Sequence, residues 1–133
     1  MTRMQRITFV ALSVVLTAIV TVAQAPGAGA TQDSRFAGVW TSVDNDGSHQ
    51  TLRIAGSGHG ALAMFLFDDS ATGACDGLPA HVVGSGRPVG DIVVMKASLV
   101  CLPGGNPIRH RINLVFELVN GALVDETGVV WGR

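Results

Sequence analysis

The sequence predicts an all-β protein, most simply a small eight-stranded antiparallel meander barrel with one disulfide. Three observations support this fold. Beyond residue 30 no run shows a helical period; β-branched or alternating apolar runs recur about every ten to twelve residues; and Gly, Asn and Asp separate them. A two-layer β-sandwich of similar strand order is the alternative.

The chain opens with the three parts of a secretory signal. Residues 1–6 hold two arginines and no acid, residues 7–22 are predominantly apolar, and residues 23–30 are mostly small residues with helix breakers. An uncleaved anchor is the alternative, but a helix over 7–22 spans only about 24 Å, against a hydrocarbon core of ~30 Å. We expect cleavage after Ala30, or else after Ala25. The only membrane contact that we expect is that of the signal segment before it is cleaved.

Removal of residues 1–30 leaves an N-terminal arm (31–35) and a single β-barrel domain (36–133). Seven basic and ten acidic residues remain, a formal net charge of −3. This balance argues against a nucleic-acid partner, and the high apolar content argues against disorder. We therefore expect a secreted, extracytoplasmic globular domain.

Eight strands are expected, at residues 36–43, 49–54, 60–67, 78–84, 91–100, 108–119, 122–125 and 128–132. Asn120-Gly121 is the strongest hairpin signal, because both residues tolerate a positive φ. The glycine-rich segments 55–60 and 84–90 are interpreted as hairpin loops. The run 61–67 is apolar on both faces, so it is either covered or forms an exposed patch.

Period-two alternation assigns the faces of the strands. In the sixth strand His110 falls on the apolar side, where it is either a buried, hydrogen-bonded histidine or a ligand contact at the mouth of a pocket. The residues expected to line the interior are Leu52, Met95, His110, Leu114 and Phe116. In a barrel this small, such side chains either fill the interior or leave a cavity.

The two cysteines, Cys75 and Cys101, are predicted to form a disulfide, since an even count in an exported protein usually does so. In a meander every second loop falls at the same end of the barrel. The cysteines lie in the third and fifth loops, so the predicted topology brings them to one end. No spacing of the cysteines indicates a metal site or a catalytic thiol.

The same end gathers acidic residues: Asp44, Asp46, Asp68, Asp69, Asp76, Asp125 and Glu126. Weak candidates for a cation site are Asp44, Asp46, Asp68 and Asp69. An EF-hand does not fit, because with Gly47 in the sixth position the twelfth is Arg53. Turn formation and surface solvation are the preferred interpretations, so no metal is expected.

No catalytic constellation is present in the sequence. The Gly-Ser-Gly-His-Gly run at 56–60 has neither the nucleophile-elbow spacing nor a following helix, and it lacks the lysine of a phosphate loop. The four histidines lie on different segments, and no paired carboxylates lie in apolar surroundings. We expect a non-enzymatic protein without a cofactor.

Gly38-Val39-Trp40 near the start of the domain and Val130-Trp131-Gly132-Arg133 at its end resemble the calycin pattern of lipocalins, avidins and small bacterial metalloprotease-inhibitor barrels. The resemblance implies a closed barrel in which Trp40 packs against Arg133 by a cation–π contact. The chain has no room for the helix that follows the lipocalin barrel, and it lacks a Trp-rich biotin pocket. Residues 40–48 also resemble the opening of a broad group of small exported bacterial domains. Both resemblances imply a fold and no activity.

Three functions remain open. The first is a module that binds a small apolar ligand, or a partner protein on its loops. The second is a secreted protein-interaction module, such as a protease inhibitor, that uses the arm 31–35 or the third strand with Phe65 and Phe67. The third is a loosely cation-binding envelope protein.

Overall fold

The computed structural model describes residues 35–58, 60–103 and 110–133, without the side chains of residues 57 and 58. The predicted signal segment (1–30), the arm except Arg35, and the start of the predicted sixth strand lie outside these residues. The described elements are β1 (Gly38–Val43), β2 (His49–Gly58), β3 (Ala61–Asp68), α2 (Thr72–Cys75), β4 (Ala80–Val89), β5 (Ile92–Cys101), β6 (His110–Val119), β7 (Ala122–Asp125) and β8 (Val130–Trp131). No described helix is long and apolar enough to cross a membrane.

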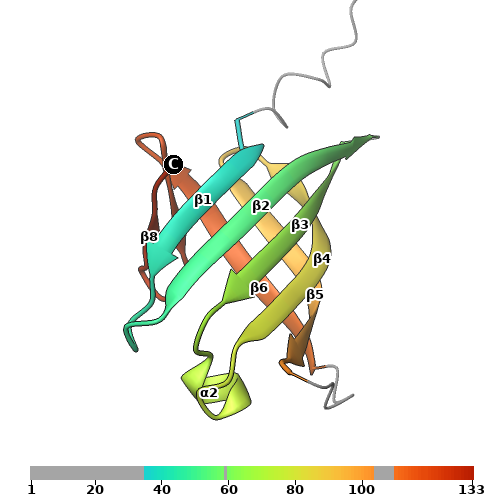
Figure 1. Cartoon of the computed structure of the whole chain (residues 1–133). Coiled ribbons are helices and arrows are strands. Elements are labelled where there is room, and N and C mark those ends of the chain that lie inside the picture. The colour runs from blue at the N-terminus through green and yellow to red at the C-terminus, as the bar shows by residue number, and fades with distance from the viewer. Residues whose placement is uncertain (1–34, 59, 104–109) are drawn as a thin grey trace, which may run out of the picture.

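The strands form one antiparallel sheet in the order of the chain, from β1 to β8. The sheet curls until β1 reaches the end of β8, where Thr41 and Gly132 exchange two backbone hydrogen bonds of 2.8 and 2.9 Å. The result is a nearly closed meander barrel (Figure 1). The predicted fold is confirmed, and the sandwich alternative is wrong.

Two predicted loops are wrong, because β2 and β4 run well into the glycine-rich segments. In β4 the reason is close packing against β5. A Cβ atom on Gly84 would lie 2.2 Å from the carbonyl oxygen of Lys96, and one on Gly86 would lie 2.7 Å from Val93 Cγ2. Glycine therefore serves here as a strand residue that lets two curved strands approach each other.

The helix α2 was not predicted, because a single turn is too short to show a helical period. It lies between β3 and β4 at one end of the barrel, with the β1–β2 turn beside that end (Figure 1). Its Cys75 is bonded to Cys101 at the end of β5, with the two Cα atoms 5.5 Å apart. The predicted disulfide is thus confirmed.

The opposite end of the barrel, where the described chain begins and ends, is packed. The indole Nε1 of Trp40 donates to the carbonyl of Phe36 at 2.8 Å, and both side chains are buried. The guanidinium of Arg133 lies 4.1 Å from the centre of the Trp40 ring and donates to the carbonyl of Arg35 at 2.6 Å. The contact between Trp40 and Arg133 that the calycin resemblance implied is confirmed.

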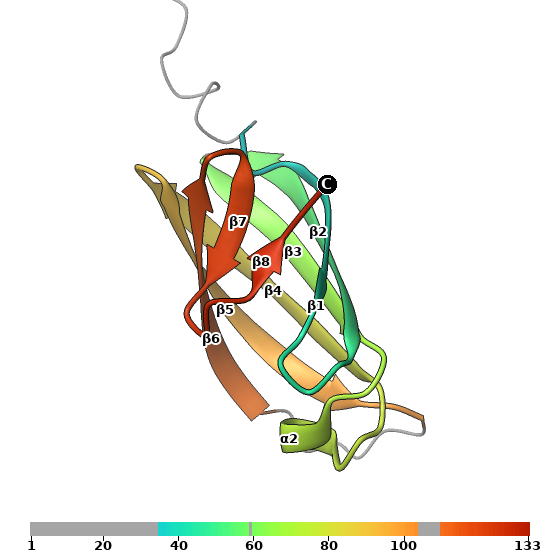
Figure 2. The same cartoon turned by 90° about the vertical axis from the view of Figure 1, so that its left-hand side faces the viewer.

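The last strands close only part of the wall. β6 pairs with β5 along residues 110–117, but with β7 only along 116–119. Among the described residues, the first half of β6 (residues 110–115) therefore has a strand neighbour on one side only. Figure 2 shows β7 and β8 as short strands. They lie beside the second half of β6, where β7 pairs with residues 116–119.

Candidate ligand-binding pocket

A pocket of about 320 Å³ occupies the α2 end of the barrel. Its interior is formed by apolar side chains from five strands: Leu66 of β3, Val82 of β4, Leu99 of β5, Ile112, Leu114 and Phe116 of β6, and Trp131 of β8. These side chains meet because each occupies an inward position of its strand. The edge of the Phe116 ring packs against Trp131, with the ring centres 5.7 Å apart.

The pocket lies beside the half of β6 that lacks a second neighbour. Ile112 and Leu114 point inward but are only partly buried, whereas most inward apolar residues of β2 to β5 are buried. The rest of the lining comes from turns, from α2 and from the last residue of β7: Asp44, Asp46, Thr72, Gly73, Ala74, Asp125, Glu126 and Thr127. The apolar interior is therefore reached through a rim that is polar and acidic.

The rim carboxylate of Asp46 joins the β1–β2 turn to α2. It accepts hydrogen bonds from the hydroxyl of Thr72 and from the backbone N–H of Ser48, the latter at 3.0 Å. These bonds, that from Thr72 above all, hold the pKa of Asp46 below its ordinary value. The residue is thus a fixed anion at neutral pH.

Two further carboxylates meet at a single amide. Nε2 of Gln50 donates to Asp44 at 3.2 Å and to Asp68 at 3.0 Å, while Oε1 of Gln50 accepts from the hydroxyl of Ser42 at 3.1 Å. Asp68 also accepts from the backbone N–H of Ser70 at 2.9 Å and is buried. Two negative charges of the pocket lining therefore converge on one neutral group.

On the other side of the rim, Asp125 organises the β7–β8 turn. It accepts from the backbone N–H groups of Thr127 and Val129, at 2.9 and 3.0 Å, and from the indole of Trp131 at 3.1 Å. All of these donors are neutral. They fix the position of the carboxylate and leave its charge uncompensated.

The four weak metal candidates do not form a coordination group. No three metal-ligating side chains come together anywhere in the described ranges. Asp44, Asp46 and Asp68 each accept a backbone N–H from one or two residues further on, and Asp69 instead accepts that of His49 at 2.8 Å. These contacts are those of turn-forming residues.

The expected interior residues divide into three groups. Leu114 and Phe116 line the pocket, whereas Leu52 and Met95 are fully buried in the packed part of the core. For His110 the prediction is wrong, because its side chain is exposed. It is the first residue of β6, opposite Leu99, and in the described part of the chain no second strand pairs with β6 there.

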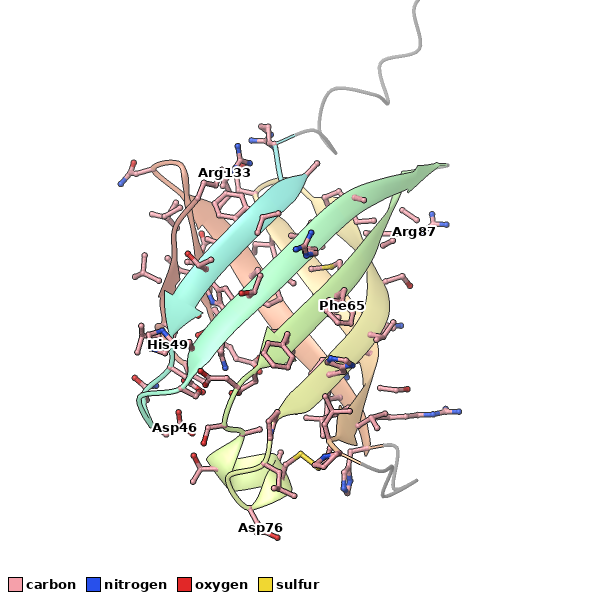
Figure 3. The ribbon with its side chains drawn as sticks, in the orientation of Figure 1. Asp46, His49, Phe65, Asp76, Arg87 and Arg133 are labelled. Atoms are coloured by element: carbon pink, nitrogen blue, oxygen red, sulfur yellow. A yellow bond between two sulfur atoms is a disulfide. The ribbon has the colours of Figure 1, made fainter. Side chains whose placement is uncertain are left out.

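The third strand is apolar on both faces, as its sequence indicates. Leu62, Met64 and Leu66 are buried inside, while Phe65 and Phe67 lie outside and are partly exposed. Both outer rings pack edge-on against His81 of β4, with centres 5.0 and 5.5 Å apart. Phe65 lies on the outer face of the sheet in Figure 3.

The geometry defines a class of protein: an antiparallel meander barrel that is packed at one end and has a pocket at the other. Comparison of the chain with family models, curated proteins and solved structures gives no match. The calycin relationship therefore stays a prediction that rests on the residues described above.

Proposed function

We propose that this protein is an exported, non-enzymatic binding module that holds a small apolar molecule in the pocket at its α2 end. The observation that carries the proposal is the apolar cavity of about 320 Å³. Ligand pockets begin at roughly 300 Å³ and combine apolar walls with a few polar groups at fixed positions. This pocket has that composition.

Packing supports the same conclusion. Protein interiors are normally filled, and voids larger than a water molecule are few. Here one half of the interior is packed around Trp40 and Leu52, while Ile112 and Leu114 in the other half remain partly exposed. An apolar ligand would cover these two side chains and gain about 25 cal/mol for each Å² removed from water.

Export is supported by the predicted signal segment and by the disulfide, because disulfides persist in oxidising compartments. A binding role without catalysis is supported by the polar groups of the pocket. Most of them are bonded to other side chains of the lining: Gln50 to Asp44 and Asp68, Thr72 to Asp46, and the Trp131 indole to Asp125. Such groups orient a ligand and select it.

Titration with a neutral probe, decanol, tests the proposal by calorimetry and by tryptophan fluorescence. Trp131 lines the pocket and Trp40 does not, so the emission of Trp131 should change on binding. Leu114→Trp fills the pocket and should abolish binding. Val119→Trp, at an exposed position of the same strand, is the matched control and should bind normally.

Absence of decanol binding to the folded wild-type protein would contradict the proposal. Equal binding to wild type and Leu114→Trp would show that the probe lies elsewhere, and would contradict it as well. Circular dichroism establishes that both tryptophan variants are folded.

The second candidate function is that of a protein-interaction module such as a protease inhibitor. It is favoured by the outer face of β3 and β4, where Phe65 and Phe67 are joined by Val83, which is 55% exposed. Inhibition of secreted proteases that Phe65→Lys abolishes would support this function. A complete lack of inhibition by the wild-type protein would count against it.

A further inference from the structure

The residues that line the pocket carry charge of one sign only. Five are acidic and none of the described lining residues is basic: Asp44, Asp46, Asp68, Asp125 and Glu126. Resting on the function proposed above, we infer that the ligand is an amphiphile with one cationic group, an ammonium or a guanidinium. Its apolar body lies between Leu114, Phe116 and Trp131, and its charged group lies at the rim.

The negative charge of the rim is not neutralised within the part of the chain that the structure describes. The ion pair seen there, between Arg35 and Asp91 at 2.6 Å, belongs to the opposite end of the barrel. Hydrogen bonds from neutral N–H and O–H groups hold four of the five carboxylates in place. Because these carboxylates are already held in position, they need little reordering when a cation binds, and the entropic cost of binding is lower.

The pair Asp44 and Asp68 gives the strongest point of attraction. Both carboxylates accept from the same Gln50 amide, so their oxygens face a common space from the β1–β2 turn and from the end of β3. Asp68 is buried, where charge interactions are screened less than at the surface. A cation beside this pair relieves the repulsion between the two anions, and a carboxylate headgroup increases it.

Selection by charge therefore disfavours fatty acids and other anionic amphiphiles. At a separation of about 6 Å in water, one pair of unit charges changes the affinity about threefold. Several carboxylates act together at this rim, so the difference between a cationic and an anionic ligand of equal length should exceed tenfold. Salt should reduce the difference, because Asp46 and Glu126 of the rim are exposed to solvent.

Three probes with the same chain length test the inference: decylammonium, decanol and decanoate, titrated at pH 7 below their micellar concentrations. We expect decylammonium to bind most tightly and decanoate most weakly. Equal affinities of all three would overturn the inference and leave the proposed function standing. Failure of all three to bind would overturn the proposed function itself.

A pair of variants locates the effect. Asp44→Asn/Glu126→Gln removes two rim charges and keeps an oxygen acceptor at residue 44, whereas Asp91→Asn/Glu117→Gln removes two exposed charges that do not line the pocket. The rim variant should bind decylammonium about tenfold more weakly and decanol unchanged. The control should bind both as wild type does. An equal loss in the two variants would assign the preference to net charge and overturn the rim as its source. The wild-type probe series decides the matter if the rim variant does not fold.

Discussion

The two ends of the barrel are built from the same sheet and end in opposite ways. At one end the buried side chains of Phe36 and Trp40 fill the interior, and the exposed Arg133, labelled in Figure 3, covers the Trp40 ring. At the other end the interior is a pocket, and turns and the short helix α2 take the place of a strand along part of the wall. The α2 end is acidic, whereas the packed end holds the cation of Arg133.

The difference follows from the lengths of the strands. β2 to β6 have eight to ten residues, but β7 has four and β8 has two. The last two strands cover only the half of β6 nearest the packed end. The comparison teaches that a small barrel gains a pocket by shortening its closing strands, without a change in strand number or topology.

Of the changes considered, removal of the disulfide should lower the free energy of unfolding most. It changes the α2 end of the barrel and leaves the contacts of the packed end in place. The variant Cys75→Ala/Cys101→Ala frees two residues that are 26 apart in the sequence. In the chain-entropy model its free energy of unfolding falls by about 3.5 kcal/mol. Urea denaturation measures the loss, and reduced wild type should match the variant. A loss below about 1 kcal/mol would contradict this expectation.

Leucine truncation compares the two ends directly. Leu62 is fully buried in the packed part, and Leu114 borders the pocket and is partly exposed. Leu62→Ala should cost about 3 kcal/mol, because it creates a new cavity. Leu114→Ala enlarges an existing cavity and should cost about 1 kcal/mol. Equal losses in urea denaturation would mean that the pocket is as tightly packed as the rest of the core.

Arg133 should contribute less. Arg133→Ala removes a cation–π contact with Trp40 and a hydrogen bond to the carbonyl of Arg35, and should lower the free energy of unfolding by about 1 kcal/mol. Arg87→Ala, at an exposed position on β4, is the control and should leave the unfolding midpoint unchanged. If both variants have the unfolding midpoint of wild type, Arg133 does not stabilise the packed end.

The smallest expected effect is a pH dependence at the α2 end. The folded-state pKa of Asp46 lies below the value of about 3.9 for an unfolded chain. Its contribution to stability is therefore present above about pH 4 and is lost as the pH falls through the folded-state pKa. The difference in urea midpoint between wild type and Asp46→Asn should shrink below pH 4. Asn45→Ala, in the same turn, removes no titratable group, so its difference from wild type should not change with pH; a parallel trend would contradict the assignment to Asp46.

The sequence predicts the features that local chemistry determines. Alternation and turn residues give the strand order, and the order places Cys75 and Cys101 at one end. The acidic turns fall at that same end for the same reason. The rim of the candidate site was therefore predictable as a cluster, although its hydrogen bonds were not.

The features that depend on distant neighbours were not predictable. Gly84 stands at the predicted end of a strand and Gly86 in a predicted loop, and only the proximity of β5 shows that the strand continues through both. His110 obeys the alternation, but its exposure depends on where β7 ends. The same strand lengths decide which apolar residues line the pocket and which are packed in the core. Leu114 and Leu52 therefore have similar patterns in the sequence but different surroundings.

The incomplete wall has a consequence for the solubility of the protein. A strand whose backbone lacks a neighbour is a template on which another chain can add a strand, and such edges lead to aggregation. Along this half of β6 the outward residues Arg111 and Asn113 are exposed and polar. Charged and polar side chains at an edge oppose strand addition, so these two residues protect this part of β6. Apolar substitutions there should favour assembly of the chains into extended sheets.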